Sequence, residues 1–527
     1  MKPFLPFRLR RLVRLGAWGA LPALLGGCLS PGVRPAPAPS FALARPEDTR
    51  LGAALAGSER LHPGRSGFAL LDYGLEALLA RIAAADAAER TLDVQCYIYD
   101  RDPAGEVLTR HLLEAADRGV RVRLLLDDFN FEAGRRLAAL DEHPRIEVRI
   151  FNPVSRRGPW PRLLAYALHF HRADRRMHDK VFVADNEVAI LGGRNIGGDY
   201  FNLGAKRPFR DFDLLGAGPV AAEASAVFDR FWNSPWAVPA AVVTGRAPAP
   251  GDLAWLRRRL ASPSAPAAWF EERYVDSGRS YRDSFASDRN TLVWAEGEIV
   301  SDPPAKAGES DPSLDPVARR FTEEWARARR EVLLEQAYFL PGADGALDFP
   351  DFRATGAAVR VLTSGPDTTD VPLVYGAYHV ARRQLLEEGV ELHEFRKQPP
   401  RSPPGNPWFR VRPAYAALHS KVAVFDRQVA WIGTFNLDPR SVRLNTEIAA
   451  VIRSPELSRR LAAAIVDDFS PERSWRVQLG REAGSRPVVL TGEVGGRMVV
   501  RRSQAVGLWR RLEVFLFSLI PEIRDQL

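Results

Sequence analysis

A chain of 527 residues is longer than one typical domain, so we expect two similar domains of about 200 residues each. Hydrophobic residues make up 46% of the chain and charged residues 26%, which excludes a disordered protein and is typical of a globular one. The net charge of +8 by itself favours a nucleic-acid-binding function. However, five of these charges lie before residue 28 (Lys2, Arg8, Arg10, Arg11 and Arg14), which leaves about +3 for the body (8 minus 5) and weakens that interpretation.

Residues 1–27 have the pattern of a secretory signal peptide. A basic stretch precedes the apolar run 15–25, which is shorter than a typical membrane-spanning helix. The run ends in Leu25-Gly26-Gly27-Cys28, which resembles the bacterial lipobox, in which the cysteine is lipidated and becomes the new N-terminus. This indicates an envelope lipoprotein facing the periplasm, and Leu29 slightly favours the outer membrane. An ordinary signal peptide and an uncleaved anchor are the alternatives. With Cys28 acylated, Cys96 has no disulfide partner within the chain.

The body of the chain has a strand–helix rhythm that occurs twice. The strand-like segments form two sets, at 90–99, 119–126 and 145–151 and at 330–339, 358–362 and 389–395. A helix-like segment precedes each of them, and the matching order argues for an internal duplication. We therefore expect an α/β fold with a tether, an N-terminal domain, a linker, a C-terminal domain and a tail, over residues 28–65, 66–245, 246–290, 291–480 and 481–527.

Three further stretches suggest contact with lipid. The irregular loops 152–176 and 397–413 run directly into the motifs described below, and both carry arginine beside tryptophan, which suits the phosphate–acyl boundary of a lipid. A solvated basic loop is the alternative interpretation. In the tail, apolar residues at helical spacing between Leu508 and Leu519 predict an amphipathic helix that would lie in the membrane interface or pack on the body.

One short pattern occurs once in each half. The first copy contains His178, Lys180, Asp185 and Asn195, and the second contains His419, Lys421, Asp426 and Asn436, so that both read H-x-K-x4-D-x6-G-[GT]-x-N. Only six lysines occur in this arginine-rich chain, and two of them lie in the motifs, which indicates that a compact ammonium is needed there. The two sets of side chains could converge on one phosphate if the halves pack face to face.

Strand periodicity predicts how each copy is arranged. The histidine and lysine of H-x-K point to the same face, because side chains alternate along a strand. Two apolar runs follow, which we interpret as a hairpin that returns the asparagine beside the histidine. Asp185 and Asp426 lie beyond the buried strand, so we expect them to anchor the fold or balance charge. A lone histidine near a strand is more often structural, but two in-register copies favour phosphate chemistry.

The doubled motif resembles that of the phospholipase D superfamily, over about residues 66–480. The segments 175–178, 192–201 and 516–522 are similar to those of bacterial cardiolipin synthases. The resemblance implies two tandem, pseudo-twofold-related α/β/α domains, each with a mixed central sheet, and one shared active site at their interface. Gly193 and Thr434 depart from the family, which commonly has serine at these positions.

The resemblance also implies a mechanism. One imidazole attacks phosphorus to form a phosphohistidine, while the other protonates the leaving alcohol and then deprotonates the attacking alcohol or water. By analogy we favour His178 as the nucleophile. The lysines and asparagines would hold the non-bridging oxygens, so no metal or cofactor is implied. An acid is expected to bond each imidazole: Glu447, and Asp213 with Asp211 as its competitor. The candidate catalytic residues are His178, Lys180, Asp185, Asn195, His419, Lys421, Asp426, Asn436, Glu447 and Asp213.

These observations predict a phosphatidyl transferase that forms cardiolipin at a membrane surface. The expected substrates are phospholipids, phosphatidylglycerol and also phosphatidylethanolamine, and no nucleic acid is expected as a partner. The first alternative is a hydrolytic phospholipase D or another phosphodiesterase; a nuclease is disfavoured because the body lacks a concentrated basic charge. The second is a non-enzymatic envelope lipoprotein that keeps the fold as a scaffold, which would not need both sets of motif residues.

Overall fold

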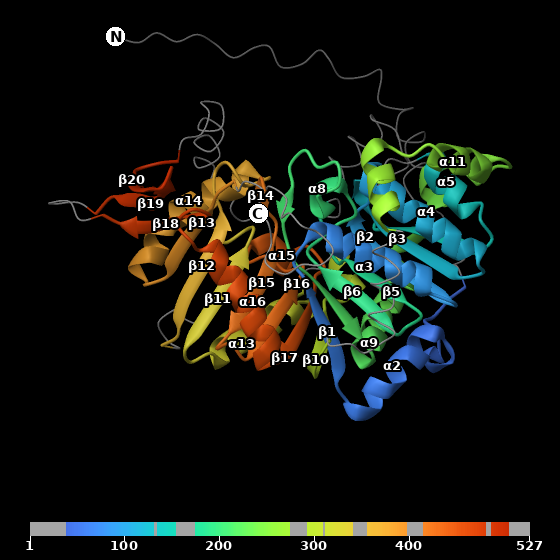
Figure 1. The fold of residues 1–527 in the computed structure, drawn as a ribbon, viewed down its shortest axis with the longest axis horizontal. Helices are drawn as coiled ribbons and strands as arrows, with labels where there is room; N and C mark the ends of the chain where they lie inside the picture. Colours follow the sequence, from blue (N-terminus) through green and yellow to red (C-terminus); the bar gives the residue numbers. More distant parts are fainter. Residues whose placement is uncertain are drawn as a thin grey trace, which may run out of the picture. The chain divides into compact units, whose positions relative to one another are not determined.

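Two similar sets of strands, joined edge to edge, form one 18-stranded mixed sheet. We describe it from a computed structural model, for residues 38–130, 134–153, 174–274, 292–308, 311–340, 356–397, 415–480 and 486–504. The chain divides into the units 1–39 and 40–527, and nearly all described residues belong to the second. Figure 1 shows the strands of both halves within this unit.

The first half has a parallel centre flanked by antiparallel strands. Strands β2, β3 and β4 are parallel, and β5, β6, β8 and β1 continue the sheet on one side while β9 continues it on the other. The bounds are β1 (Ser66–Leu71), β2 (Thr91–Ile98), β3 (Arg121–Asn130), β4 (Ile146–Phe151), β5 (Val181–Ala184), β6 (Val188–Gly192), β8 (Asp213–Ala217) and β9 (Ala237–Pro239).

The second half repeats this order and extends it by two strands, β19 and β20. Its parallel strands β11, β12 and β13 are followed on one side by β15, β16, β17 and β10 and on the other by β18, β19 and β20. Antiparallel pairing of β1 with β10 joins the halves. The bounds are β10 (Val293–Ser301), β11 (Glu331–Gln336), β12 (Ala358–Ser364), β13 (Glu391–Phe395), β15 (Lys421–Phe425), β16 (Val429–Gly433), β17 (Ile448–Arg453), β18 (Ser474–Leu479), β19 (Val488–Val494) and β20 (Arg497–Arg501). The duplicated α/β fold predicted from the sequence is thereby confirmed.

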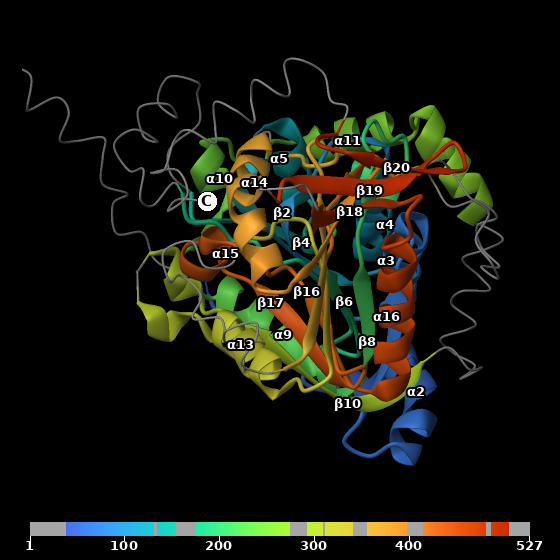
Figure 2. The ribbon, with the colours of Figure 1, turned by 90° about the vertical axis from the view of Figure 1, so that its left-hand side faces the viewer.

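Helices cover both faces of each half. Along β15, Ala423 and Phe425 pack with α13 and α14, whereas Val422 and Val424 face α16, as the period-two alternation of a strand requires. Figure 2 shows α13 and α16 on opposite sides of the second-half strands. The corresponding helices of the first half are α3, α4 and α5 on one face and α9 on the other. The bounds are α3 (Gly74–Ala87), α4 (Pro103–Asp117), α5 (Arg135–Asp141), α9 (Pro219–Trp232), α13 (Pro316–Arg327), α14 (Pro372–Glu387) and α16 (Pro455–Asp468).

Several segments interpreted as connections contain regular structure. The predicted tether includes η1 (Pro46–Asp48) and α2 (Arg50–Leu61), whose Leu51 and Leu55 are buried in the first-half core. The helix α10 (Ala240–Thr244) ends just before the predicted linker, which itself includes α11 (Asp252–Leu260), and the tail supplies β19 and β20. Further short elements are η2 (Pro304–Ala307), η3 (Pro312–Leu314), α8 (Gly198–Phe201) and α15 (Pro439–Arg443).

Other predictions concern residues that the structure does not describe. They include the signal peptide and Cys28, most of the two arginine- and tryptophan-containing loops, and the amphipathic tail helix. No helix within the described ranges is both long and apolar enough to cross a bilayer.

Candidate active site

Each motif forms a β-hairpin that brings its asparagine back toward its histidine. In the first half, β5 and β6 pair antiparallel around a turn at Asp185 and Asn186, which have φ values of 51° and 57°. His178 and Lys180 precede β5, and Asn195 follows β6 at the same end. In the second half, β15 and β16 form the same hairpin around Asp426. The hairpin expected from the two apolar runs is therefore present in both halves.

Asp185 and Asp426 lie at the turns, far from the histidines. The Asp185 carboxylate accepts hydrogen bonds from the backbone amides of Glu89, Arg90 and Thr91, each at 2.8 Å. The Asp426 carboxylate accepts three equivalent bonds of 2.7–2.9 Å from residues 329–331. An extended chain of seven residues puts each aspartate about 20 Å from its histidine. Their inclusion among the catalytic candidates is thus corrected: they brace the starts of β2 and β11.

The two halves meet through paired strand segments beside the histidines. The first-half segment before His178 pairs in parallel with Thr446: the His178 amide donates to the Thr446 carbonyl at 3.0 Å. On the other side, β7 (Phe209–Arg210) pairs in parallel with β14 (Ala417–Leu418), and the His419 amide donates to the Arg210 carbonyl at 2.8 Å. In both cases, the histidine of one half lies next to the residue that follows the paired segment of the other half.

That following residue is an acid in both cases. The Nδ1 atom of His178 lies 2.9 Å from Oε2 of Glu447, and Nδ1 of His419 lies 2.7 Å from Oδ2 of Asp211. Each histidine of one half is therefore bonded by a carboxylate of the other half. Because Nδ1 is occupied, Nε2 is the ring nitrogen left for chemistry on each histidine.

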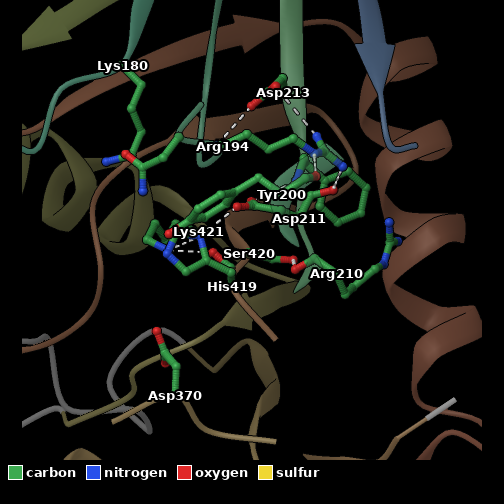
Figure 3. A network of polar contacts seen from close by, with 12 residues as sticks. Lys180, Arg194, Tyr200, Arg210, Asp211, Asp213, Asp370, His419, Ser420 and Lys421 are labelled. Carbon is green, nitrogen blue, oxygen red and sulfur yellow. Dashed lines mark hydrogen bonds and ion pairs between the residues drawn. The ribbon is translucent and has the colours of Figure 1, made fainter. Parts of the chain in front are cut away.

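Asp213, which we expected to bond a histidine, contacts neither. Its Oδ2 forms ion pairs with Arg81 at 2.9 Å and with Arg194 at 3.6 Å. Figure 3 shows Asp211 beside His419 and Asp213 turned toward Arg194. The register explains the difference, because the amide of Gly193 bonds the carbonyl of Phe212 while that of Thr434 bonds the carbonyl of Ile448. In each half, the acid that contacts a histidine is the residue immediately before this carbonyl. Asp211 therefore corresponds to Glu447.

The two positions that depart from the family serve these acids differently. The Thr434 hydroxyl donates a hydrogen bond to Oε2 of Glu447, the oxygen that also faces His178. At Gly193 a Cβ atom would lie only 2.2 Å from Oδ1 of Asp211. The absence of a side chain at 193 thus leaves the space that Asp211 occupies.

Both lysines and both histidines are buried in one cluster. Burial lowers the pKa of His178 well below its usual value, and the charges of Lys180 and Lys421 lower it further. Burial and Lys421 also lower the pKa of His419, while Asp211 opposes them. The pKa of Lys180 falls to about 7 through burial, and that of Lys421 is lowered for the same reason. An anionic group between these lysines would favour their charged forms.

The two acids differ in how their ionisation is controlled. Burial raises the pKa of Glu447 to about 7, although the Thr434 hydrogen bond and the charge of Lys180 act to lower it. Burial acts in the same direction on Asp211, but the hydrogen bond from His419 and the charge of Lys421 outweigh it and lower the pKa of that carboxyl. The composite site therefore holds two carboxyls of unequal acidity.

Aromatic rings enclose both imidazoles. The Tyr97 ring meets His178 edge-on at 5.3 Å and lies 5.5 Å from Nζ of Lys180, and Tyr200 and Phe209 each lie 5.1 Å from the His419 ring. We did not single out these rings from the sequence. The Gln-x-Tyr pattern shared by residues 95–97 and 336–338 was the available signal for Tyr97.

The two motif asparagines are both buried at the histidine end of their hairpins. Oδ1 of Asn195 accepts a hydrogen bond from the Ile98 amide at 3.2 Å. Oδ1 of Asn436 is buried and has no hydrogen-bond partner among the described residues. The structure thus brings together His178, Lys180, Asn195, His419, Lys421, Asn436 and Glu447 at the junction of the halves, with Asp211 in place of Asp213.

One group of side chains elsewhere has the composition of a metal site. Asp86, His111 and Glu114 lie on α3 and α4, and they are the only such group within the described ranges. His111 is already bonded through both ring nitrogens, to Asp86 at 2.7 Å and to Glu271 at 3.3 Å. These contacts link α3 and α4 to Glu271.

These features define a duplicated α/β protein with one composite histidine–lysine site. The chain belongs to the phospholipase D superfamily, in the family described as "Cardiolipin synthase, PLD-like domain", whose model matches residues 81–232 and 321–468, one match in each half. It is 33% identical over 467 residues to cardiolipin synthase C of Escherichia coli (strain K12), covering 87% of this chain and 96% of that protein. It is 30% identical to an uncharacterised protein of Helicobacter pylori (strain ATCC 700392 / 26695), covering 83% and 85% of the two chains.

The fold is also similar to that of a solved structure. The crystal structure of phosphatidylserine synthase from Haemophilus influenzae Rd KW20 superposes with a TM-score of 0.54 at 13% identity, and the match covers 90% of this chain and 98% of that one. This likeness supports the tandem arrangement of the two halves.

Proposed function

We propose that the protein is a phosphatidyl transferase that forms cardiolipin through a phosphohistidine intermediate. The crossed pairing of His178 with Glu447 and of His419 with Asp211 carries this proposal, because it directs two Nε2 atoms and two lysines to one place. The similarity to cardiolipin synthase C over nearly the whole chain supports phospholipids as the substrate class.

The environments of the two histidines favour His178 as the nucleophile. Burial and the cationic side chains Lys180 and Lys421 favour a neutral His178 imidazole, which is the form that attacks. His419 lies beside Asp211, whose carboxylate stabilises a proton on that ring against the effect of burial. His419 is therefore assigned as the acid in the first step and the base in the second.

The proposed reaction forms the phosphohistidine in a first step and consumes it in a second. Nε2 of His178 forms a bond to phosphorus while the bond from phosphorus to the head-group oxygen breaks, and the proton of His419 passes to that oxygen. In the second step an acceptor hydroxyl gives its proton to His419 and attacks phosphorus, and the bond to His178 breaks. Lys180, Lys421 and Asn436 are assigned to the non-bridging oxygens, where negative charge is concentrated.

Burial favours transfer over hydrolysis. The exposed fractions of His178 and His419 are 8% and 5%, which limits the access of water to the intermediate. We assign phosphatidylglycerol and phosphatidylethanolamine as substrates, and we propose that acylation of Cys28 holds the enzyme at the periplasmic face of an envelope membrane. A hydrolytic phospholipase D is the second candidate, because water and an alcohol would be activated by the same base.

The test uses the purified full chain with phosphatidylglycerol, with and without phosphatidylethanolamine, and separates cardiolipin from phosphatidic acid. Cardiolipin is expected from the wild type and from His62→Ala, a histidine that stacks on Trp294 away from the motifs, but not from His178→Ala or His419→Ala. Phosphatidic acid alone would establish hydrolysis. Cleavage of single-stranded DNA with inert lipids would overturn the proposal.

A further inference from the structure

An acid that the mechanism does not use faces the His419 side of the site. Asp370 lies in the loop between β12 and α14 and is partly buried. Figure 3 shows its carboxylate turned toward His419 and Lys421 and separate from them. Within the described ranges, no lysine or arginine forms an ion pair with Asp370, in contrast to Asp213, which pairs with Arg81.

The loop that carries Asp370 is fixed to β14, the strand that ends immediately before His419. The Leu418 amide donates to the Thr368 carbonyl at 3.3 Å, and the Thr368 hydroxyl donates to the Phe395 carbonyl on β13 at 3.1 Å. Arg207, from the first half, donates to the Thr369 carbonyl. Asp370 therefore has a defined position relative to both halves of the site.

A tyrosine holds the carboxylate itself. The Tyr338 hydroxyl donates to Oδ1 of Asp370 at 2.8 Å. This single bond orients the carboxylate and leaves further acceptor positions on it, because an ionised carboxylate has about four. The charge of Asp370 acts on the nearby bases: burial lowers the pKa of Lys421, whereas Asp211 and then Asp370 raise it.

Apart from Glu447, which bonds Nδ1 of His178, the charged groups that act most on this histidine are cations. After burial, the groups that act most on His178 are the cations Lys180 and Lys421, together with His419 and Arg440. The site is thus cationic where the phosphate is expected and anionic beyond His419. In the proposed mechanism the head-group alcohol leaves from, and the acceptor alcohol enters at, the His419 side.

We propose that Asp370, oriented by Tyr338, binds the hydrogen-bond donor that the head-group alcohol carries two carbons from its reacting oxygen. The donor is a second hydroxyl in glycerol and an ammonium in ethanolamine, and both are recognised by a carboxylate. Alcohols that lack a donor gain nothing from Asp370, and alcohols with a carboxylate are repelled by it. This inference rests on the proposed function and adds its head-group specificity.

The experiment compares three donors that share the phosphatidyl group: phosphatidylglycerol, phosphatidylethanolamine and phosphatidylmethanol, whose head group has no donor. The release of each alcohol by the full chain is measured as kcat/KM. For Asp370→Ala we expect losses of about tenfold to a hundredfold with phosphatidylglycerol or phosphatidylethanolamine, which is the usual effect of removing a charged partner. The rate with phosphatidylmethanol is expected to stay within about twofold.

A second variant separates the two donor groups. Asp370→Asn keeps an acceptor oxygen and removes the charge, so it is expected to restore much of the rate with phosphatidylglycerol and little of that with phosphatidylethanolamine. A selective loss with either substrate supports the inference and names the group that is bound. Tyr338→Phe should reduce the same rates by a smaller factor, because the carboxylate remains but is no longer oriented.

Glu387→Gln is the matched control, since it removes an exposed carboxylate at the far end of α14. It should leave all three rates unchanged. Equal losses with all three donors in Asp370→Ala, or no loss with any, would overturn the inference while the proposed function stands. Absence of head-group release by the wild type would overturn both.

Discussion

Glu447 of the second half bonds His178 of the first half, with Oε2 2.9 Å from Nδ1, and the Thr434 hydroxyl donates to the same oxygen. Asp211 of the first half forms the equivalent bond with His419 of the second half, at 2.7 Å. Neither half therefore contains a complete site, and the orientation of each imidazole depends on the packing of the two halves. This dependence explains why the two motifs are useful only as a pair.

Glu447→Gln should reduce kcat by about a hundredfold or more, because an amide can present its NH2 group to Nδ1 and favour the wrong tautomer of His178. Burial raises the pKa of Glu447 to about 7, so the wild-type carboxyl is protonated below that pH and ionised above it. The phosphate of the bound substrate favours the charged form of Lys180, whose pKa also falls to about 7 through burial, so wild-type kcat should rise with pH through about 7. Rates of cardiolipin formation between pH 5 and 9 test this, and a rate that is independent of pH below 7 would contradict it.

Gly193→Ala should reduce kcat by about tenfold to a hundredfold, because the new Cβ would lie 2.2 Å from Oδ1 of Asp211 and displace the acid that orients His419. Gly57→Ala is the control, since a Cβ there meets no atom within 4 Å. The measurement is steady-state kinetics together with thermal unfolding. Equal effects of the two substitutions on kcat would show that Asp211 tolerates the displacement.

Asp185→Asn should destabilise the fold by about 2–4 kcal/mol and leave kcat of the folded enzyme nearly unchanged. The carboxylate accepts three backbone hydrogen bonds at the start of β2, and an amide can accept with only one of its two groups. Urea denaturation and active-site-normalised rates are the measurements, with the exposed Asp311→Asn as control. A large fall in kcat at unchanged stability would show that Asp185 has a catalytic role.

The sequence contained enough information to predict the duplication, the hairpins and the pairing of two motifs. These depend on local hydrophobic periodicity and on a pattern that recurs in register, both of which are properties of short segments. The same reasoning predicted that Asp185 and Asp426 lie beyond the buried strand, although both remained among the catalytic candidates.

The partner of His419 could not be identified by counting residues. Glu447 follows its motif asparagine by 11 positions, whereas Asp211 follows Asn195 by 16, because the connection between α8 and β7 is longer in the first half. The register of β8 against β6 decides that Asp211, and not Asp213, reaches the junction. Asp370 was not predicted either, since its position depends on bonds from its loop to Leu418 and Arg207, which are distant in the sequence.

Glu335→Gln should make the stability of the protein less dependent on pH. Glu335 is fully buried on β11, where its Oε1 accepts a hydrogen bond from Ser420 at 2.6 Å and its Oε2 has no hydrogen-bond partner among the described residues. Burial raises the pKa of this carboxyl to about 8, although the charge of Arg210 acts to lower it. The folded state therefore keeps this proton at pH values where the unfolded chain has already lost it.

Because the folded pKa of Glu335 is raised, its contribution to stability is present in full below the unfolded value of about 4.3 and is lost as the pH rises toward about 8. The slope from one such group is at most about 1.4 kcal/mol per pH unit. The glutamine variant cannot ionise, so we expect it to be more stable than the wild type by about 2 kcal/mol at pH 9 and to lose this advantage near pH 5. Urea denaturation at both pH values measures the difference, with Glu387→Gln as the exposed control. Parallel stability profiles for the variant and the wild type would mean that Glu335 is already ionised in the folded protein at neutral pH.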